Sequence, residues 1–126
     1  MEIKIGDFGL AVVIDVEGEK RMSLCGTPNY IAPEVLDTEG HSFEVDVWSL
    51  GCIIFTMIAG FPPFESQNVK MTYKKIKDNE FFFPEKAKFS LLAKDLISKI
   101  LTHDPEDRLT VDQILDHPWM NKEEEY

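Results

Sequence analysis

The longest apolar stretch of the chain lies at residues 42–60, and it predicts the helix around which the other elements pack. No charged residue occurs between Asp46 and Glu65, so apolar side chains surround the helix, as is typical of a buried one. Ser42 is expected to cap its start, and Gly60 to end it in a left-handed conformation. The helical part is then shorter than the roughly 20 residues that span a bilayer, which predicts a core helix.

Two residues of this helix carry further information. Gly51 costs about 1 kcal/mol relative to alanine in a helix interior, which suggests that another backbone comes close at this position. Asp46 has two interpretations: a first-turn acid that complements the helix dipole, or a buried acceptor that holds another loop in place. Spacing alone favours the first interpretation.

An amphipathic pattern predicts another helix at residues 68–78. Its apolar side consists of Val69, Tyr73 and Ile76. The other side is mostly basic and is expected to be a solvated face: Lys70, Lys74, Lys75 and Lys77.

Two capping signals predict the last helices. Ser90 is expected to cap a helix whose apolar residues fall at helical spacing, namely Leu92, Leu96, Ile97, Ile100 and Leu101. Thr110 and Gln113 match a capping box for a final short helix that ends at His117, Pro118 and Trp119.

Composition narrows the class of protein. The 126 residues are 44% hydrophobic, which is ample for a packed core. Thirteen basic and 23 acidic residues give a net charge of −10, which argues against nucleic acid or an anionic membrane as a partner. Cys25 and Cys52 make no disulfide framework, and no signal peptide is visible, so we expect a reducing intracellular compartment, cytoplasm or nucleus.

The first residues predict a short strand followed by a loop. Ile3, Lys4 and Ile5 alternate apolar and charged, and the triplet Asp7-Phe8-Gly9 follows. The triplet alone is most often a turn, but it could also hold a metal-binding carboxylate with the aromatic ring packed beneath it.

A long polar stretch from residue 10 to 31 shows little periodicity, and loops of this length tend to be functional or disordered. It ends in Gly26-Thr27-Pro28-Asn29-Tyr30, and Ala32-Pro33-Glu34 follows. Asp-Phe-Gly followed at this distance by Ala-Pro-Glu resembles the activation segment of protein kinases, in the form found in serine/threonine kinases.

Residues 23–36 and 40–49 are similar to the polo-like kinases in particular. This resemblance implies a mainly α fold, a kinase-like C-lobe fragment with a short N-terminal strand and a long activation loop. It implies a partial kinase domain at 1–119, with an activation segment at 7–34, C-lobe helices at 42–119 and an acidic tail at 120–126.

The resemblance also implies roles for single residues. Asp7 would ligate the Mg²⁺ that bridges the ATP phosphates, Phe8 would pack to report active or inactive geometry, and Gly9 would be a hinge. Ser23 occupies the position of the activating phosphosite, the target of an upstream kinase. The segment expected to bind the protein substrate is Cys25, Gly26, Thr27, Pro28 and Tyr30; within it, the Thr27 hydroxyl would meet the catalytic aspartate.

Three residues have implied structural roles. Glu34 and Arg108, within Ala-Pro-Glu and Asp-Pro-x-x-Arg, are expected to form a buried ion pair. The counterpart of Asp46 in the family is buried and braces the catalytic loop, which reverses the preference for a first-turn acid.

Of the residues that phosphoryl transfer needs, this chain has Asp7 alone. The sequence has no glycine-rich phosphate loop, no Val-Ala-Ile-Lys strand and no His-Arg-Asp loop. We therefore expect the substrate-binding half of a kinase, inactive by itself, with protein substrates and an upstream kinase as partners. The alternatives are an inactive kinase-derived binding module and an unrelated helical scaffold.

Overall fold

Helices are the regular elements of the described part of the chain, which in this computed structural model comprises residues 1–9, 11, 13, 28–37, 40 and 42–121. In chain order they are η1 Pro28–Tyr30, α1 Pro33–Leu36, α2 Glu44–Ala59, α3 Val69–Lys77, α4 Leu91–Ile100, α5 Val111–Leu115 and α6 Pro118–Asn121. None of these helices is long and apolar enough to cross a membrane.

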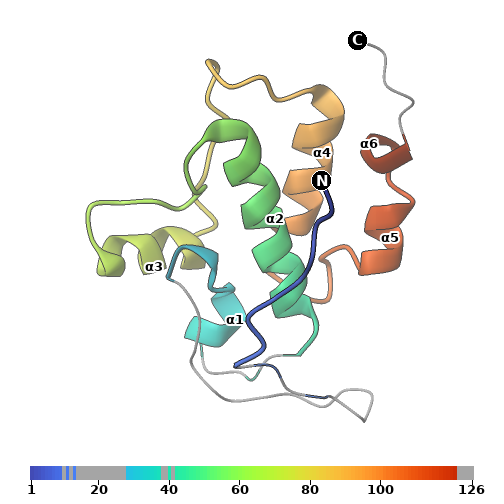
Figure 1. The fold of residues 1–126 in the computed structure, drawn as a ribbon. Coiled ribbons are helices and arrows are strands. Elements are labelled where there is room, and N and C mark those ends of the chain that lie inside the picture. Colours follow the sequence, from blue (N-terminus) through green and yellow to red (C-terminus); the bar gives the residue numbers. More distant parts are fainter. Residues whose placement is uncertain (10, 12, 14–27, 38–39, 41, 122–126) are drawn as a thin grey trace.

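Helix α2 lies at the centre of the arrangement (Figure 1). It packs against α4 on one side and η1 on another, while α3 packs against α1 and η1, and α6 joins α4 to α5. The core centres on three fully buried aromatic residues, Trp48, Phe55 and Phe64. The mainly α prediction is confirmed.

An aromatic cluster fastens the connection between α3 and α4 to the core. The ring of Phe55 lies 5.2 Å from Phe89, 5.9 Å from Phe83 and 6.2 Å from Phe81, centroid to centroid. Such pairs contribute about 0.5–1.5 kcal/mol beyond the burial of their area. This irregular segment is therefore held in place without secondary structure.

The close approach predicted at Gly51 is present. A methyl group at this position would overlap Cγ2 of Ile100 and lie 3.0 Å from Cδ2 of Leu101. The glycine therefore lets α4 approach α2 more closely than any other residue would allow.

Most predicted helix ends are confirmed. Gly60 ends α2 at φ 87° and donates its N–H to the Thr56 carbonyl at 2.8 Å. The Ser90 side chain caps α4, and Thr110 with Gln113 forms the capping box of α5.

The predicted cap by Ser42 is wrong. Phe43 precedes α2 in a helical conformation and makes no side-chain cap. The N–H groups of Val45 and Asp46 instead donate to the carbonyls of Ser42 and Phe43, so a tight turn satisfies the donors that a cap would have taken.

The predicted N-terminal strand is also wrong, because residues 1–8 have no regular structure. Ile3 is 89% exposed and Ile5 is similarly open. A strand needs a neighbour to pair its backbone groups, and no described segment provides one.

Three further details differ from the sequence prediction. The segment after η1 forms the short helix α1, which was not predicted. The last helix was expected to end at residues 117–119, but Pro118 begins a further helix, α6. Proline suits a first helical position because its fixed φ is already helical. In α3 the buried residues are Thr72 and Ile76, whereas Val69 is half exposed, because the face toward α1 and η1 is centred one position away from the expected side.

Candidate functional site

Arg108 and Glu34 form a buried, two-pronged ion pair between segments 74 positions apart. Nη1 donates to Oε2 at 2.8 Å and Nη2 to Oε1 at 3.0 Å. The remaining donors reach the carbonyls of Glu44 at 2.7 Å, Thr102 at 3.1 and 3.2 Å and His103 at 3.4 Å. The exposed fractions of the two side chains are 0% and 5%, so the predicted buried pair is confirmed.

An aromatic stack supports this ion pair. The Arg108 guanidinium carbon lies 5.0 Å from the centre of the Trp48 ring, which stacks on Phe64 at 5.4 Å and 11°. A desolvated guanidinium over an indole face gains about 2 kcal/mol. The arginine, in the loop between α4 and α5, thereby joins α1 to α2.

The segment before and within α1 is firmly attached to this core. Ile31, Ala32, Pro33 and Val35 are buried. The Ser49 hydroxyl of α2 donates to the carbonyl of Tyr30 at 3.0 Å. Residues 30–36 therefore have a fixed position on α2, and η1 is held at the surface, where Tyr30 is half-buried.

Asp7, Phe8 and Gly9 lie at the surface. Asp7 has φ 62° and makes no ion pair with a described residue. Phe8 is 67% exposed, so its predicted packing is not observed, because no described element covers it.

These residues do not complete a magnesium site. Mg²⁺ is usually held by one or two carboxylates together with phosphate oxygens and water. Within the described residues no group of three or more His, Cys, Asp or Glu side chains could hold a metal ion, and Asp7 is a single carboxylate.

Several predicted site residues lie outside the described residues, namely Ser23, Cys25, Gly26 and Thr27. Of the predicted substrate-binding segment, the structure describes the backbone of Pro28 and the whole of Tyr30, both in η1. Their proposed roles stay predictions.

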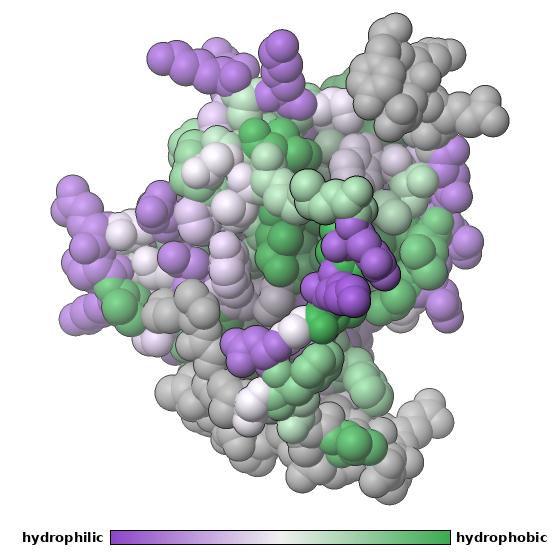
Figure 2. Space-filling view, in the orientation of Figure 1, coloured by the Kyte–Doolittle hydropathy of each residue, from purple (hydrophilic) through white to green (hydrophobic). Residues whose placement is uncertain are grey.

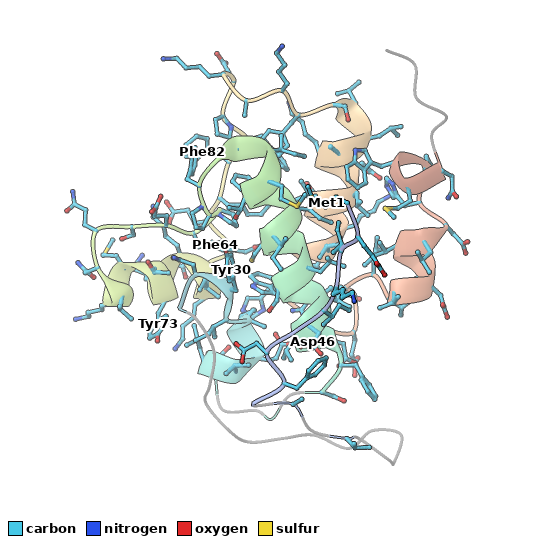
Figure 3. All side chains as sticks on the ribbon, in the orientation of Figure 1. Met1, Tyr30, Asp46, Phe64, Tyr73 and Phe82 are labelled. Atoms are coloured by element: carbon cyan, nitrogen blue, oxygen red, sulfur yellow. The ribbon has the colours of Figure 1, made fainter. Side chains whose placement is uncertain are left out.

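Asp46 is exposed, contrary to the predicted burial (Figure 3). It lies in line with Leu50, Ile53 and Met57 at spacings of four, three and four residues, and Met57 is 78% exposed. We call these four residues the α2 stripe; Figure 2 shows green apolar surface in the region of α2. The predicted burial of α2 on all sides is therefore wrong along this stripe, which the described elements leave exposed.

A second polar contact, which is partly buried, was not predicted. Nε2 of the buried His117 lies 2.7 Å from Oδ2 of Asp95, and its Nδ1 accepts the N–H of Trp119 at 3.0 Å. The proton therefore lies on Nε2, which donates to the carboxylate. Hydrogen bonds from His117, and then from Lys99 at 3.0 Å, lower the pKa of the Asp95 carboxyl. The only sequence signal was a polar residue at the end of the last predicted helix.

Cys52 is excluded as a reactive group. It is fully buried in α2, and this burial raises the pKa of its thiol to about 12. The thiol therefore stays protonated and is a packing residue.

The buried ion pair of Glu34 and Arg108 joins an Ala-Pro-Glu segment to an Asp-Pro-x-x-Arg segment. Comparison with known proteins shows to which family the chain belongs. The family model for the protein kinase domain matches residues 1–120. The chain belongs to the protein kinase family. That its Asp-Phe-Gly and Ala-Pro-Glu triplets border a kinase activation segment stays a prediction.

Individual kinases are also similar over nearly the whole chain. "Serine/threonine-protein kinase PLK1" of Xenopus laevis is 54% identical over 91% of this chain and 19% of its own length. "Serine/threonine-protein kinase polo" of Drosophila melanogaster is 48% identical over 95% of this chain and 20% of its own length. "Probable cell cycle serine/threonine-protein kinase CDC5 homolog" of Encephalitozoon cuniculi is 52% identical over 98% and 26%.

These matches confirm the resemblance to the polo-like kinases. The chain spans about a fifth to a quarter of the length of these relatives.

Proposed function

We propose that this chain is the substrate-binding part of a polo-like serine/threonine kinase that acts in cell-division control. The complete gene product would transfer the γ-phosphoryl group of ATP to serine or threonine in proteins. The observation that carries this proposal is the buried pair of Glu34 and Arg108, which fixes the end of the activation segment on the helical core.

The anchored segment offers a rigid base for a substrate. A protein substrate has to be held with its hydroxyl close to the reacting phosphate, and misplacement by about 1 Å can cost a hundredfold in rate. In the proposal the Thr27 hydroxyl meets the catalytic aspartate. Residues 25–30 form a shelf for the substrate residue that follows the serine or threonine to be phosphorylated. Support comes from the Ser49 bond to Tyr30 and the burial of Ile31 to Val35, which hold the C-terminal end of this shelf.

The α2 stripe would receive the catalytic loop. Large exposed apolar patches mark interaction sites, and Leu50, Ile53 and Met57 are 37%, 44% and 78% exposed on the same side of α2 as the exposed carboxylate of Asp46. In the proposal Asp46 becomes buried when the part of the kinase that carries the catalytic loop packs on this side of α2.

Activation would follow phosphorylation of Ser23 by an upstream kinase, in the cytoplasm or nucleus. A phosphate adds about −1.5 to −2 charges and can order a loop by pairing with arginine or lysine. We expect Ser23→Ala to remove the rise in activity that the upstream kinase produces, measured as phosphate incorporated into casein. If the variant is activated as well as the wild type, Ser23 is not the site.

The alternative is an inactive kinase-derived binding module, which the single carboxylate Asp7 favours. The experiment that separates the two uses the complete gene product, Mg-ATP and dephosphorylated casein. We expect phosphoserine or phosphothreonine in the casein, and its loss in Asp7→Asn. Absence of transfer by the wild type, under conditions where another kinase works, would contradict the proposal.

A further inference from the structure

A groove of about 390 Å³ lies between the C-terminal end of α2 and the connection that joins α3 to α4. One wall consists of Ile58, Ala59 and Phe61, and the other begins at Pro84 and continues to residue 88. Figure 1 shows these two segments together at the top of the view. We call this depression the α2-end groove. Its volume lies within the range of about 300–1,000 Å³ that is usual for binding clefts.

Both walls of the α2-end groove are fixed by one buried ring. Phe61 lies 6.2 Å from Phe55, while Phe83 and Phe89, which flank the second wall, lie 5.9 and 5.2 Å from it, centroid to centroid. Phe83 and Phe89 also contact each other at 4.9 Å. A partner that enters a preformed groove does not have to order its walls, and this lowers the entropic cost of binding.

Two lysines of the second wall give the α2-end groove a positive rim. Lys86 lies within a turn that the Ala87 N–H closes on the Pro84 carbonyl at 3.1 Å, and Lys88 follows this turn directly. Both lysines are exposed, and neither forms an ion pair with a residue that the structure describes. Glu85 is the one acid among residues 84–88. The rim is therefore locally positive in a chain of net charge −10.

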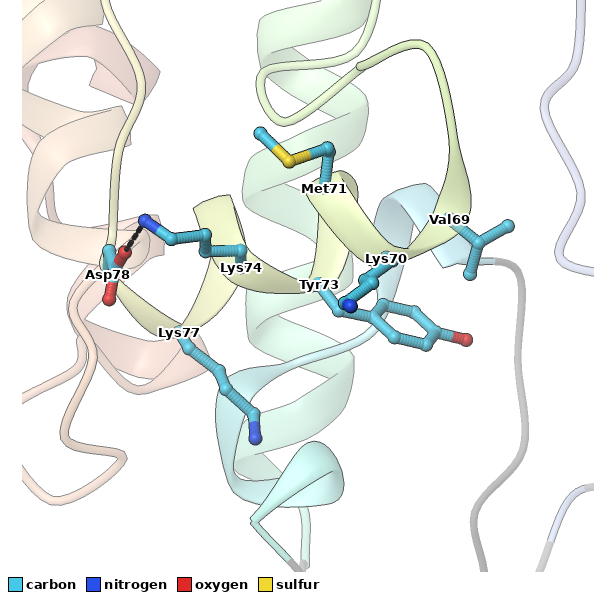
Figure 4. A pocket seen from close by; sticks show the side chains of 7 residues that line it. All are labelled: Val69, Lys70, Met71, Tyr73, Lys74, Lys77 and Asp78. Carbon is cyan, nitrogen blue, oxygen red and sulfur yellow. Dashed lines mark hydrogen bonds and ion pairs between the residues drawn. The ribbon is translucent and has the colours of Figure 1, made fainter.

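A larger depression on α3, of about 690 Å³, offers less free charge (Figure 4). Lys74 pairs there with Asp78 at 3.1 Å, and Lys77 pairs with Asp37 at 3.5 Å. Two of the three lysines that line this depression are thus already paired. Both lysines of the α2-end groove, in contrast, are available to a partner.

The end of α2 adds main-chain acceptors to the groove. In a longer helix, residues 62 and 63 would donate to the carbonyls of Ile58 and Ala59, but both are prolines and have no N–H. Neither carbonyl accepts a main-chain hydrogen bond from the described part of the chain. Two residues that line the groove therefore have carbonyls available to the main-chain N–H groups of a partner.

The α2-end groove is remote from the predicted substrate segment. Ser49, whose hydroxyl donates to the Tyr30 carbonyl, precedes Ala59 by ten residues. Ten residues of helix span about 15 Å. A partner in the groove would therefore leave η1 open.

We propose that the α2-end groove binds an acidic, extended segment of a partner protein. Its carboxylates would pair with Lys86 and Lys88, and an apolar side chain would pack against Phe61 and Pro84. An extended segment is favoured over a helical one because the N–H groups of a helix are already bonded within it. The apolar wall suits a polypeptide better than a bare polyanion, and the net charge of −10 opposes nucleic acid. This inference goes beyond the proposed kinase function and does not depend on it.

A binding experiment with the complete gene product tests the proposal. The probe is a fluorescein-labelled peptide that carries a leucine between two pairs of glutamates, and binding is followed by fluorescence anisotropy. Lys86→Glu/Lys88→Glu should weaken binding at least about tenfold, because repulsion replaces two ion pairs. The matched control is Lys4→Glu/Lys70→Glu, which makes the same charge change at two exposed lysines elsewhere and should weaken binding less than about threefold.

A second peptide isolates the apolar contact. Serine in place of the leucine removes the apolar side chain and keeps every carboxylate, and it should weaken binding to the wild type about tenfold. Equal binding of the two peptides would overturn the proposal, because any cationic surface would then account for the affinity.

Chemical protection locates the bound peptide. Lysine amines are acetylated with an N-hydroxysuccinimide ester, and the extent at each lysine is measured by mass spectrometry. The leucine peptide should slow acetylation of Lys86 and Lys88 at least about threefold and leave Lys70 unchanged. Protection of Lys70 in place of these two lysines would move the site to α3 and overturn the proposal.

Three further results would contradict the proposal. The first two are an unchanged affinity in the Lys86→Glu/Lys88→Glu variant and an equal loss in the control variant. The third is sedimentation of the wild type as a dimer and of this variant as a monomer, which would assign the groove to a second copy of the chain. Thermal melts verify that each variant keeps its fold, and Lys86→Gln/Lys88→Gln replaces the charge reversal if the melt is lowered.

Discussion

At the scale of single residues, Arg108 makes the largest set of polar contacts in the described part of the chain. Its five donors all have acceptors, two on Glu34 and the others on main-chain carbonyls. A buried charge is tolerated only when it is paired and hydrogen-bonded, and this arrangement meets both conditions. The same contacts leave little room for a different side chain.

Arg108→Ala should therefore lower the free energy of unfolding by about 3–5 kcal/mol, because it strands the Glu34 carboxylate in a buried site. Arg108→Lys should restore only part of this loss, since an ammonium cannot grip both carboxylate oxygens in the same plane. Denaturant unfolding followed by circular dichroism measures both values. Lys74→Ala removes an exposed pair and should cost less than about 1 kcal/mol. A cost for Arg108→Ala as small as that of this control would contradict the assignment.

At the scale of elements, the contact between α2 and α4 depends on Gly51. Gly51→Ala adds a methyl group that overlaps Ile100 and presses on Leu101. Overpacking of this kind costs about 1–3 kcal/mol, and the better helix propensity of alanine returns about 1 kcal/mol. We expect a lower thermal midpoint for this variant. Met57→Ala, at an exposed position of the same helix, is the control and should leave the midpoint nearly unchanged. A Gly51→Ala variant as stable as the wild type would show that the helices can move apart freely.

The contact between α4 and the turn that precedes α6 should depend on pH. The hydrogen bond from His117, and then that from Lys99, holds the pKa of the Asp95 carboxyl below its usual value. A carboxyl with a lowered pKa stabilises the fold above its unfolded pKa, about 3.9, and this stabilisation is lost as the pH falls through the lowered value.

The melting temperature of the wild type should therefore fall more steeply than that of Asp95→Asn as the pH is lowered from about 5 to 2. Asp107→Asn, at an exposed position without an ion pair among the described residues, should follow the wild type. Parallel curves for the wild type and Asp95→Asn would show that this carboxylate does not contribute.

At the scale of the whole molecule, the sequence predicted what depends on neighbours in the chain. Caps at Gly60, Ser90 and Thr110 follow from two or three adjacent residues, and each is present. The long-range pair of Glu34 and Arg108 was predictable only because two motifs of one family contain it. No periodicity or composition would have joined residues 74 positions apart.

Other features depend on contacts that local patterns do not encode. The bond between His117 and Asp95 joins the turn between α5 and α6 to α4, and because it belongs to no sequence motif, the pairing was not predictable. Phe8 and Asp46 were expected to be buried, but burial requires a covering element, and the described part of the chain offers none to either residue. Their exposure agrees with the proposal that this chain is the substrate-binding part of a kinase and that other residues form the nucleotide site.

Calorimetric titration of Mg-ATP into the 126-residue chain tests whether the nucleotide site needs those other residues. Positioning a nucleotide takes a phosphate-binding loop, a lysine and metal ligands together, and Asp7 supplies one ligand from an exposed position. We predict no measurable heat of binding for a chain that is helical by circular dichroism and unfolds cooperatively. Micromolar affinity for Mg-ATP in the same titration would contradict the proposal that this chain lacks the nucleotide site.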